Sequence, residues 1–85
     1  PDFTPNQIYL NPAPAGIDAR YAWTLPGGRG ASVRIIDCEW GWRFTHEDLL
    51  QLQMGVVVGT SASSDNHGTA VIGEISGDRN SFGCD

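Results

Sequence analysis

The stretch Ser32-Val-Arg-Ile-Ile-Asp37 decides the fold that the sequence predicts. It is short, rich in β-branched residues and nearly apolar, as strands buried on both faces of a parallel sheet are. The stretch Gly55-Val-Val-Val-Gly59 has the same character and predicts a second short strand. Helical spacing of apolar residues predicts helices over 16–23, with Asp18 as the N-cap, and over 67–76. Strands that alternate with helices predict an α/β fold with a parallel sheet.

The predicted sheet is incomplete in this chain. Two strands do not make a parallel sheet, and helices have to cover both of its faces. The chain has 85 residues, which is one small domain at most. We therefore expect other residues to supply the rest of the architecture. Because the first residue is Pro1 and not Met, we expect a processed chain or a piece of a longer one.

Two regions are expected along the chain. Residues 1–14 hold four of the five prolines and predict an extended arm on the surface of the folded part. Ile8, Tyr9 and Leu10 are expected to be the buried residues by which this arm contacts the folded part. Residues 15–85 carry the predicted strands and helices and are expected to form the folded part.

Charge and hydropathy exclude some functions. The net charge is −5, and the sequence lacks a basic patch that would favour nucleic acid. No apolar run approaches the length of a membrane span. Two cysteines, Cys38 and Cys84, permit one disulfide, and with it a secreted setting. The alternatives are that each is a buried free thiol or is paired outside this chain. Closing that loop of about 45 residues would contribute roughly 4 kcal/mol in the chain-entropy model.

Asp37 and His67 are the candidate catalytic residues. Asp37 ends the first predicted strand, and active sites of open α/β sheets lie at the carboxyl ends of strands. His67 begins the second predicted helix, and an imidazole transfers protons near neutral pH. Each residue taken alone also fits a cap, turn or surface position. The pair fits a buried carboxylate that orients an imidazole base.

Two longer segments give a more specific resemblance. The first, SVRIIDCEWGWRFTHEDL (32–49), resembles the stretch of subtilisin-like serine proteases that contains a strand, the catalytic aspartate, a loop and a His-x-Asp-Leu element. The second, NHGTAVIGEISGDRNSFG (66–83), is similar to the block of the same family that contains the catalytic histidine in His-Gly-Thr. Residues 17–30 resemble the first helix of that family and the turn after it. The resemblance covers about 70 of the 85 residues.

The resemblance implies a three-layer α/β fold and a Ser-His-Asp endopeptidase that acts on proteins or peptides. His67 would take the proton of the serine and give it to the leaving amine, and Asp37 would hold the imidazole. None of the serines lies in a complete Gly-Thr-Ser-x-Ala motif. The chain is therefore expected to supply the aspartate and histidine only, to need a serine-bearing remainder as its partner, and to be inactive alone. The resemblance also implies that the enzyme is secreted.

The chain departs from the family pattern around the candidate site. Cys38, Glu39 and Trp40 follow the aspartate where the family has a small residue and then glycine, and Ala70 stands where another histidine is common. These departures favour an alternative function, a catalytically inactive fragment or binding module, although both catalytic residues are retained. Trp40 and Trp42 either line a substrate pocket or pack their loop onto the body.

The resemblance also implies a structural calcium ion, although the chemistry itself needs no cofactor. Asp48 of the His-x-Asp-Leu element and Asn80 of the loop after the second helix are the side-chain candidates, because hard oxygen ligands suit Ca²⁺. The alternative is a turn without metal. A zinc site built from Asp37, His46, Asp48 and His67 matches no zinc spacing.

Overall fold

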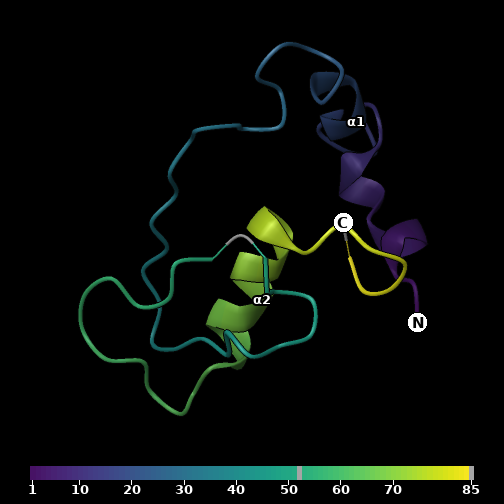
Figure 1. Ribbon diagram of the computed structural model, residues 1–85. Helices are drawn as coiled ribbons and strands as arrows, with labels where there is room; N and C mark the ends of the chain where they lie inside the picture. Colours follow the sequence, from purple (N-terminus) through teal and green to yellow (C-terminus); the bar gives the residue numbers. More distant parts are fainter. Residues whose placement is uncertain (52, 85) are drawn as a thin grey trace. The chain divides into compact units, whose positions relative to one another are not determined.

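Residues 1–51 and 53–84 are described by a computed structural model of the chain (Figure 1). In chain order, the elements are two 3₁₀ turns, η1 (Thr4–Asn6) and η2 (Ile8–Leu10), and two α-helices, α1 (Ala19–Ala22) and α2 (Asn66–Ser76). The chain divides into two compact units, one of residues 5–35 and one of residues 1–4 together with 36–85.

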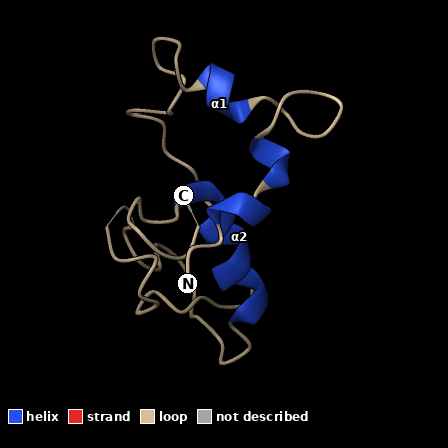
Figure 2. Ribbon diagram, turned by 90° about the vertical axis from the view of Figure 1, so that its right-hand side faces the viewer, coloured by secondary structure: helices blue, strands red, loops and turns tan. Residues whose placement is uncertain are grey.

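The prediction of a three-layer α/β sheet is wrong for this structure. The described residues contain helices and loops but no strand (Figure 2). Both predicted strands, 32–37 and 55–59, are loops in which every Val and Ile exposes between 41% and 84% of its surface. A strand is stable when a neighbouring strand pairs with its backbone and its apolar face is covered. The described residues provide neither condition here, so β propensity alone does not produce a sheet.

The first predicted helix is shorter than expected. α1 has four residues, and the amide of Trp23 closes its end on the carbonyl of Ala19 (2.9 Å). Asp18 is its N-cap, as predicted, but has a φ of 58° and makes no capping hydrogen bond with its side chain. A helix of one turn has little intrinsic stability because nucleation is costly, so this element depends on the turns around it.

The predicted arm, residues 1–14, contains the two 3₁₀ turns and is not extended throughout. Of the three residues expected to grip the surface, Leu10 is buried at 5% exposure, whereas Ile8 and Tyr9 are exposed. The amide of Leu10 donates to the carbonyl of Gln7 (3.1 Å), which closes η2.

α2 confirms the helix predicted over 67–76 to within one residue at its start. Its N-cap is Asp65, whose carboxylate accepts two hydrogen bonds from the guanidinium of Arg43 (3.2 and 3.3 Å). The amide of Arg43 donates to the hydroxyl of Thr69 (2.8 Å). These bonds fix the loop before residue 43 to the first turn of α2, where His67 lies. No helix in the described part of the chain is long and apolar enough to cross a membrane.

The unit that contains α2 is held by buried carboxylates more than by apolar packing. Leu49 is buried at 3% exposure, and so are Asp78 at 3% and Asp48 at 8%. The carboxylate of Asp78 accepts the amides of Leu50 and Gln51 (2.7 and 3.0 Å). Buried polar groups stabilise a fold only when they are hydrogen-bonded, so these bonds are structurally essential.

The N-terminal residues pair with the loop after α2. The amide of Phe3 donates to the carbonyl of Gly83 (2.7 Å), and the amide of Gly83 donates to the carbonyl of Pro1 (2.8 Å). The pairing forms an isolated parallel bridge between Asp2 and Gly83. Hydrogen bonds from the side chain and the backbone amide of Thr4 hold the pKa of the Asp2 carboxyl below its ordinary value.

Candidate functional site

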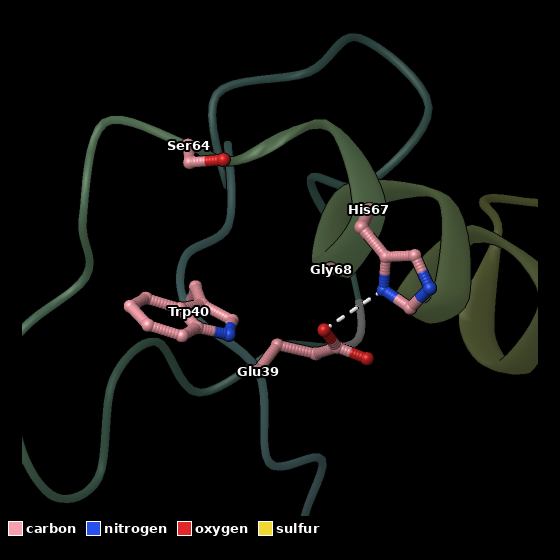
Figure 3. A pocket seen from close by; sticks show the side chains of 5 residues that line it. All are labelled: Glu39, Trp40, Ser64, His67 and Gly68. Carbon is pink, nitrogen blue, oxygen red and sulfur yellow. Dashed lines mark hydrogen bonds and ion pairs between the residues drawn. The ribbon is translucent and has the colours of Figure 1, made fainter.

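The structure does not pair the two candidate catalytic residues. His67 is the second residue of α2, and its Nδ1 lies 2.8 Å from Oε2 of Glu39 (Figure 3). Asp37 is engaged elsewhere, because its Oδ2 accepts a hydrogen bond from Nε1 of Trp42 (2.7 Å). The carboxylate that contacts the imidazole is therefore two residues further along the loop than the sequence predicts.

A pocket of about 260 Å³ surrounds this pair. It is lined by Glu39, Trp40, Ser64, His67 and Gly68. Figure 3 shows the side chain of Glu39 reaching toward the imidazole, while the indole of Trp40 and the hydroxyl of Ser64 lie away from it. The arrangement brings a carboxylate and an imidazole together, but Ser64 makes no hydrogen bond to His67 and is not placed as its nucleophile.

The geometry of the pair defines a proton acceptor. A carboxylate only accepts hydrogen bonds, so Nδ1 of His67 carries the hydrogen that Glu39 receives. In a neutral imidazole the other nitrogen, Nε2, then has a lone pair. The side chain of His67 is 81% exposed, so this lone pair is open to an incoming group. The site can therefore act as a general base.

Backbone contacts of the loop 39–43 position the carboxylate. The amide of Ala62 donates to the carbonyl of Trp40 (2.8 Å), and the amide of Trp42 donates to the hydroxyl of Ser61 (3.0 Å). Gly68 is buried at the start of α2. Because Gly68 has no side chain, the loop approaches the helix closely enough for Glu39 to reach His67.

Gly68→Ala is expected to separate the loop from α2. A Cβ at this position would meet the carbonyl oxygen of Gly41 and would lie 2.9 Å from the Cβ of Glu39 and 3.1 Å from Cδ1 of Trp42. The backbone has to shift to accept it, and we expect a loss of about 1–3 kcal/mol in the free energy of unfolding. Urea titration followed by tryptophan fluorescence measures the change. Gly73→Ala on the same helix is the control, because a Cβ there meets nothing within 4 Å; equal losses in the two variants would contradict the close approach.

Asp48 and Asn80 do lie together, but their arrangement does not fit a cation. Nδ2 of Asn80 donates to Oδ1 of Asp48 (2.9 Å), and the amide of Cys84 donates to Oδ2 (2.8 Å). The amide oxygen of Asn80 accepts the backbone amide of Phe82 (2.7 Å). Calcium needs about six to eight oxygen atoms that converge, whereas these oxygens face N–H donors. The pair forms a hydrogen-bonded turn in this structure, and the structural calcium ion stays a prediction.

The residues weighed for zinc are not brought together. Nδ1 of His46 accepts the backbone amide of Asp48 (3.2 Å), and His67 pairs with Glu39. Across residues 1–51 and 53–84, no group of three or more His, Cys, Asp or Glu side chains is placed to hold a metal ion.

Cys38 and Cys84 form no disulfide in the structure. Cys38 is exposed in the loop after Asp37, and Cys84 is half-buried beside Asp48. The pairing of Cys38 with Cys84 stays a prediction.

Sequence reasoning missed the role of Glu39. It treats this residue as a departure from the family pattern at the rim of the site, whereas the structure places its carboxylate on the imidazole. The signal that could have found it is an acidic residue two positions after Asp37, in a loop that glycines allow to approach the helix.

The chain matches no protein-family model, no curated protein and no solved structure.

Proposed function

We propose that this chain supplies the histidine and the aspartate of a subtilisin-like serine endopeptidase. The observation that carries the proposal is the state of His67, whose Nδ1 is held by a carboxylate at 2.8 Å while Nε2 is exposed. This is the form of imidazole that a Ser-His-Asp mechanism uses. The resemblance of residues 32–49 and 66–83 to the two motifs of that family supports the same assignment.

In the proposed reaction His67 is the general base. Its Nε2 takes the proton from a serine hydroxyl, and the serine oxygen then attacks the peptide carbonyl. His67 next gives this proton to the leaving amine as the peptide C–N bond breaks, which leaves an acyl-enzyme. A water then gives a proton to His67 and attacks the acyl carbon, and the serine oxygen leaves and takes that proton. The serine comes from a remainder of the protease outside this chain, so the chain alone is inactive. Substrates are proteins or peptides, and the enzyme acts outside the cell.

Asp37 is proposed as the acid that stabilises the imidazolium once the site is assembled. Its Oδ2 is fixed by the indole of Trp42, and Oδ1 takes no hydrogen bond from the described residues. One oxygen is thus held in place by the loop, and the proposed contribution of Asp37 is the negative charge of its carboxylate, since Nδ1 of His67 already pairs with Glu39.

A catalytically inactive binding module is the second candidate. The specific observation in its favour is that Asp37 and His67 have separate partners, Trp42 and Glu39, so the described chain has no Asp-His pair. Such a module would keep the pocket around His67 without any hydrolysis.

Peptide hydrolysis in the presence of two inhibitors tests the proposal. The preparation assembled with its serine-bearing remainder should cleave a protein substrate, lose activity to a serine-directed fluorophosphonate, and keep it in a chelator. Activity that a chelator abolishes and the phosphonate leaves untouched would overturn the proposal in favour of a metal-dependent hydrolase. A folded assembly that cleaves nothing would favour the binding module.

A further inference from the structure

We propose that Glu39 is a positioning residue for His67: its carboxylate accepts the Nδ1–H and so sets the tautomer in which Nε2 is the proton acceptor. The inference rests on the proposed function only in naming Nε2 as the catalytic base. The pairing itself is a property of this chain. Glu39 stands where the family that the sequence resembles has a glycine.

The contact between the two side chains is short and direct. Nδ1 of His67 and Oε2 of Glu39 are 2.8 Å apart, which is the distance of a charge-assisted hydrogen bond. An ionised carboxylate offers only lone pairs, so the bond forms when Nδ1 carries the hydrogen. Of the two neutral tautomers, Glu39 therefore stabilises the one with its hydrogen on Nδ1.

Glu39 is held better than the imidazole it orients. Its side chain is 16% exposed, whereas that of His67 is 81% exposed. The backbone after Glu39 is fixed, because the carbonyl of Trp40 accepts the amide of Ala62 (2.8 Å). The closely packed start of α2 at Gly68 lies against its Cβ. The ring of His67 is exposed and its side-chain hydrogen bond is to a nearly buried carboxylate, so the ring takes its orientation from that carboxylate.

Asp37 does not compete for this role in the described structure. Its carboxylate is bound to the indole of Trp42 at 2.7 Å. The two acids of the loop therefore have different tasks here: Asp37 fixes Trp42, and Glu39 fixes His67.

The tautomers of the two histidines in the ¹⁵N-labelled chain test the inference. Long-range ¹H–¹⁵N correlation spectra distinguish Nδ1–H from Nε2–H imidazoles at alkaline pH, where both rings are neutral. His67 should show mainly the Nδ1–H form. His46 should show the opposite form, because its Nδ1 accepts the amide of Asp48 (3.2 Å). The second histidine is thus an internal reference in the same spectrum.

Three variants separate positioning by Glu39 from a general effect on the fold. Glu39→Ala should move His67 from mainly Nδ1–H to mainly Nε2–H, and Glu39→Gln should retain a weaker Nδ1–H preference because the amide oxygen still accepts. Asp37→Asn is the matched control: it should shift the indole resonance of Trp42 and leave the His67 tautomer unchanged. An unchanged His46 tautomer in each variant shows that the surrounding loops remain folded.

The inference is overturned if His67 is mainly Nε2–H in the unmodified chain, or if Asp37→Asn changes its tautomer and Glu39→Ala does not. Neither result depends on hydrolysis. An assembly without peptidase activity would contradict the proposed function but not the positioning of His67 by Glu39. A His67 that is mainly Nε2–H in an active assembly would contradict the positioning by Glu39 but not the proposed function.

Discussion

His67→Ala is expected to lower kcat of the assembled protease by on the order of 10⁶-fold, the size of loss that follows removal of the base from a Ser-His-Asp triad. Without the imidazole, the site loses the nitrogen proposed to take the serine proton, and the carboxylate of Asp37 is bound to the indole of Trp42. Initial rates of peptide hydrolysis at saturating substrate give kcat directly. KM should change far less, because His67 acts on the proton and not on substrate binding.

The matched control for this substitution is His46→Ala. Both histidines are exposed, and each has one hydrogen bond to its own surroundings, His67 to Glu39 and His46 to the amide of Asp48. Surface substitutions of this kind usually change the free energy of unfolding by about 0.5 kcal/mol or less. His46→Ala should therefore keep nearly full kcat. If the two variants lose activity equally, or if His67→Ala retains activity within tenfold, His67 is not the base.

Asp48→Ala is expected to have the largest effect on stability, about 3 kcal/mol in the free energy of unfolding. The buried carboxylate accepts the amide of Cys84 and Nδ2 of Asn80, and its own backbone carbonyl accepts the amide of Asp78 (2.9 Å). Alanine removes both side-chain acceptors and leaves two donors unsatisfied. Small domains have only about 5–15 kcal/mol in total, so a loss of this size removes a large share of the free energy of unfolding.

Urea titration followed by far-ultraviolet circular dichroism measures this loss, with an unchanged slope as the sign that only stability changed. Asp48→Asn should recover about half of it, because one carbonyl oxygen remains to accept a hydrogen bond. Glu47→Ala, a loss of the neighbouring exposed carboxylate, is the control and should be nearly neutral. If Asp48→Ala lowers the free energy of unfolding no more than Glu47→Ala does, the loop after α2 does not depend on the side chain of Asp48.

Sequence reasoning found the elements that local patterns determine. The spacing of apolar residues in 67–76 is enough to define α2, because a helix satisfies its backbone hydrogen bonds within its own segment. Asp48 and Asn80, which the resemblance places in one site, do lie together in the structure, where Nδ2 of Asn80 donates to Oδ1 of Asp48.

The sheet and the partner of His67 could not be derived from local patterns. The segment 32–37 has β propensity, but a strand needs a partner for its backbone, and Val33, Ile35 and Ile36 are exposed in the structure. The position of Glu39 depends on the close approach of its loop to Gly68, 29 residues further along the chain. Contacts of that kind are set by backbone geometry, and no spacing of residue types encodes them.

Denaturing intact-mass measurement of the native preparation, with and without a serine-directed fluorophosphonate, tests the proposed protease most directly. The account predicts a second polypeptide beside the 85-residue chain, with one phosphonyl label on that polypeptide and none on the chain that carries His67. A single unlabelled 85-residue species would contradict the proposed protease. The preparation would then contain His67 and its neighbouring carboxylates but no activated serine.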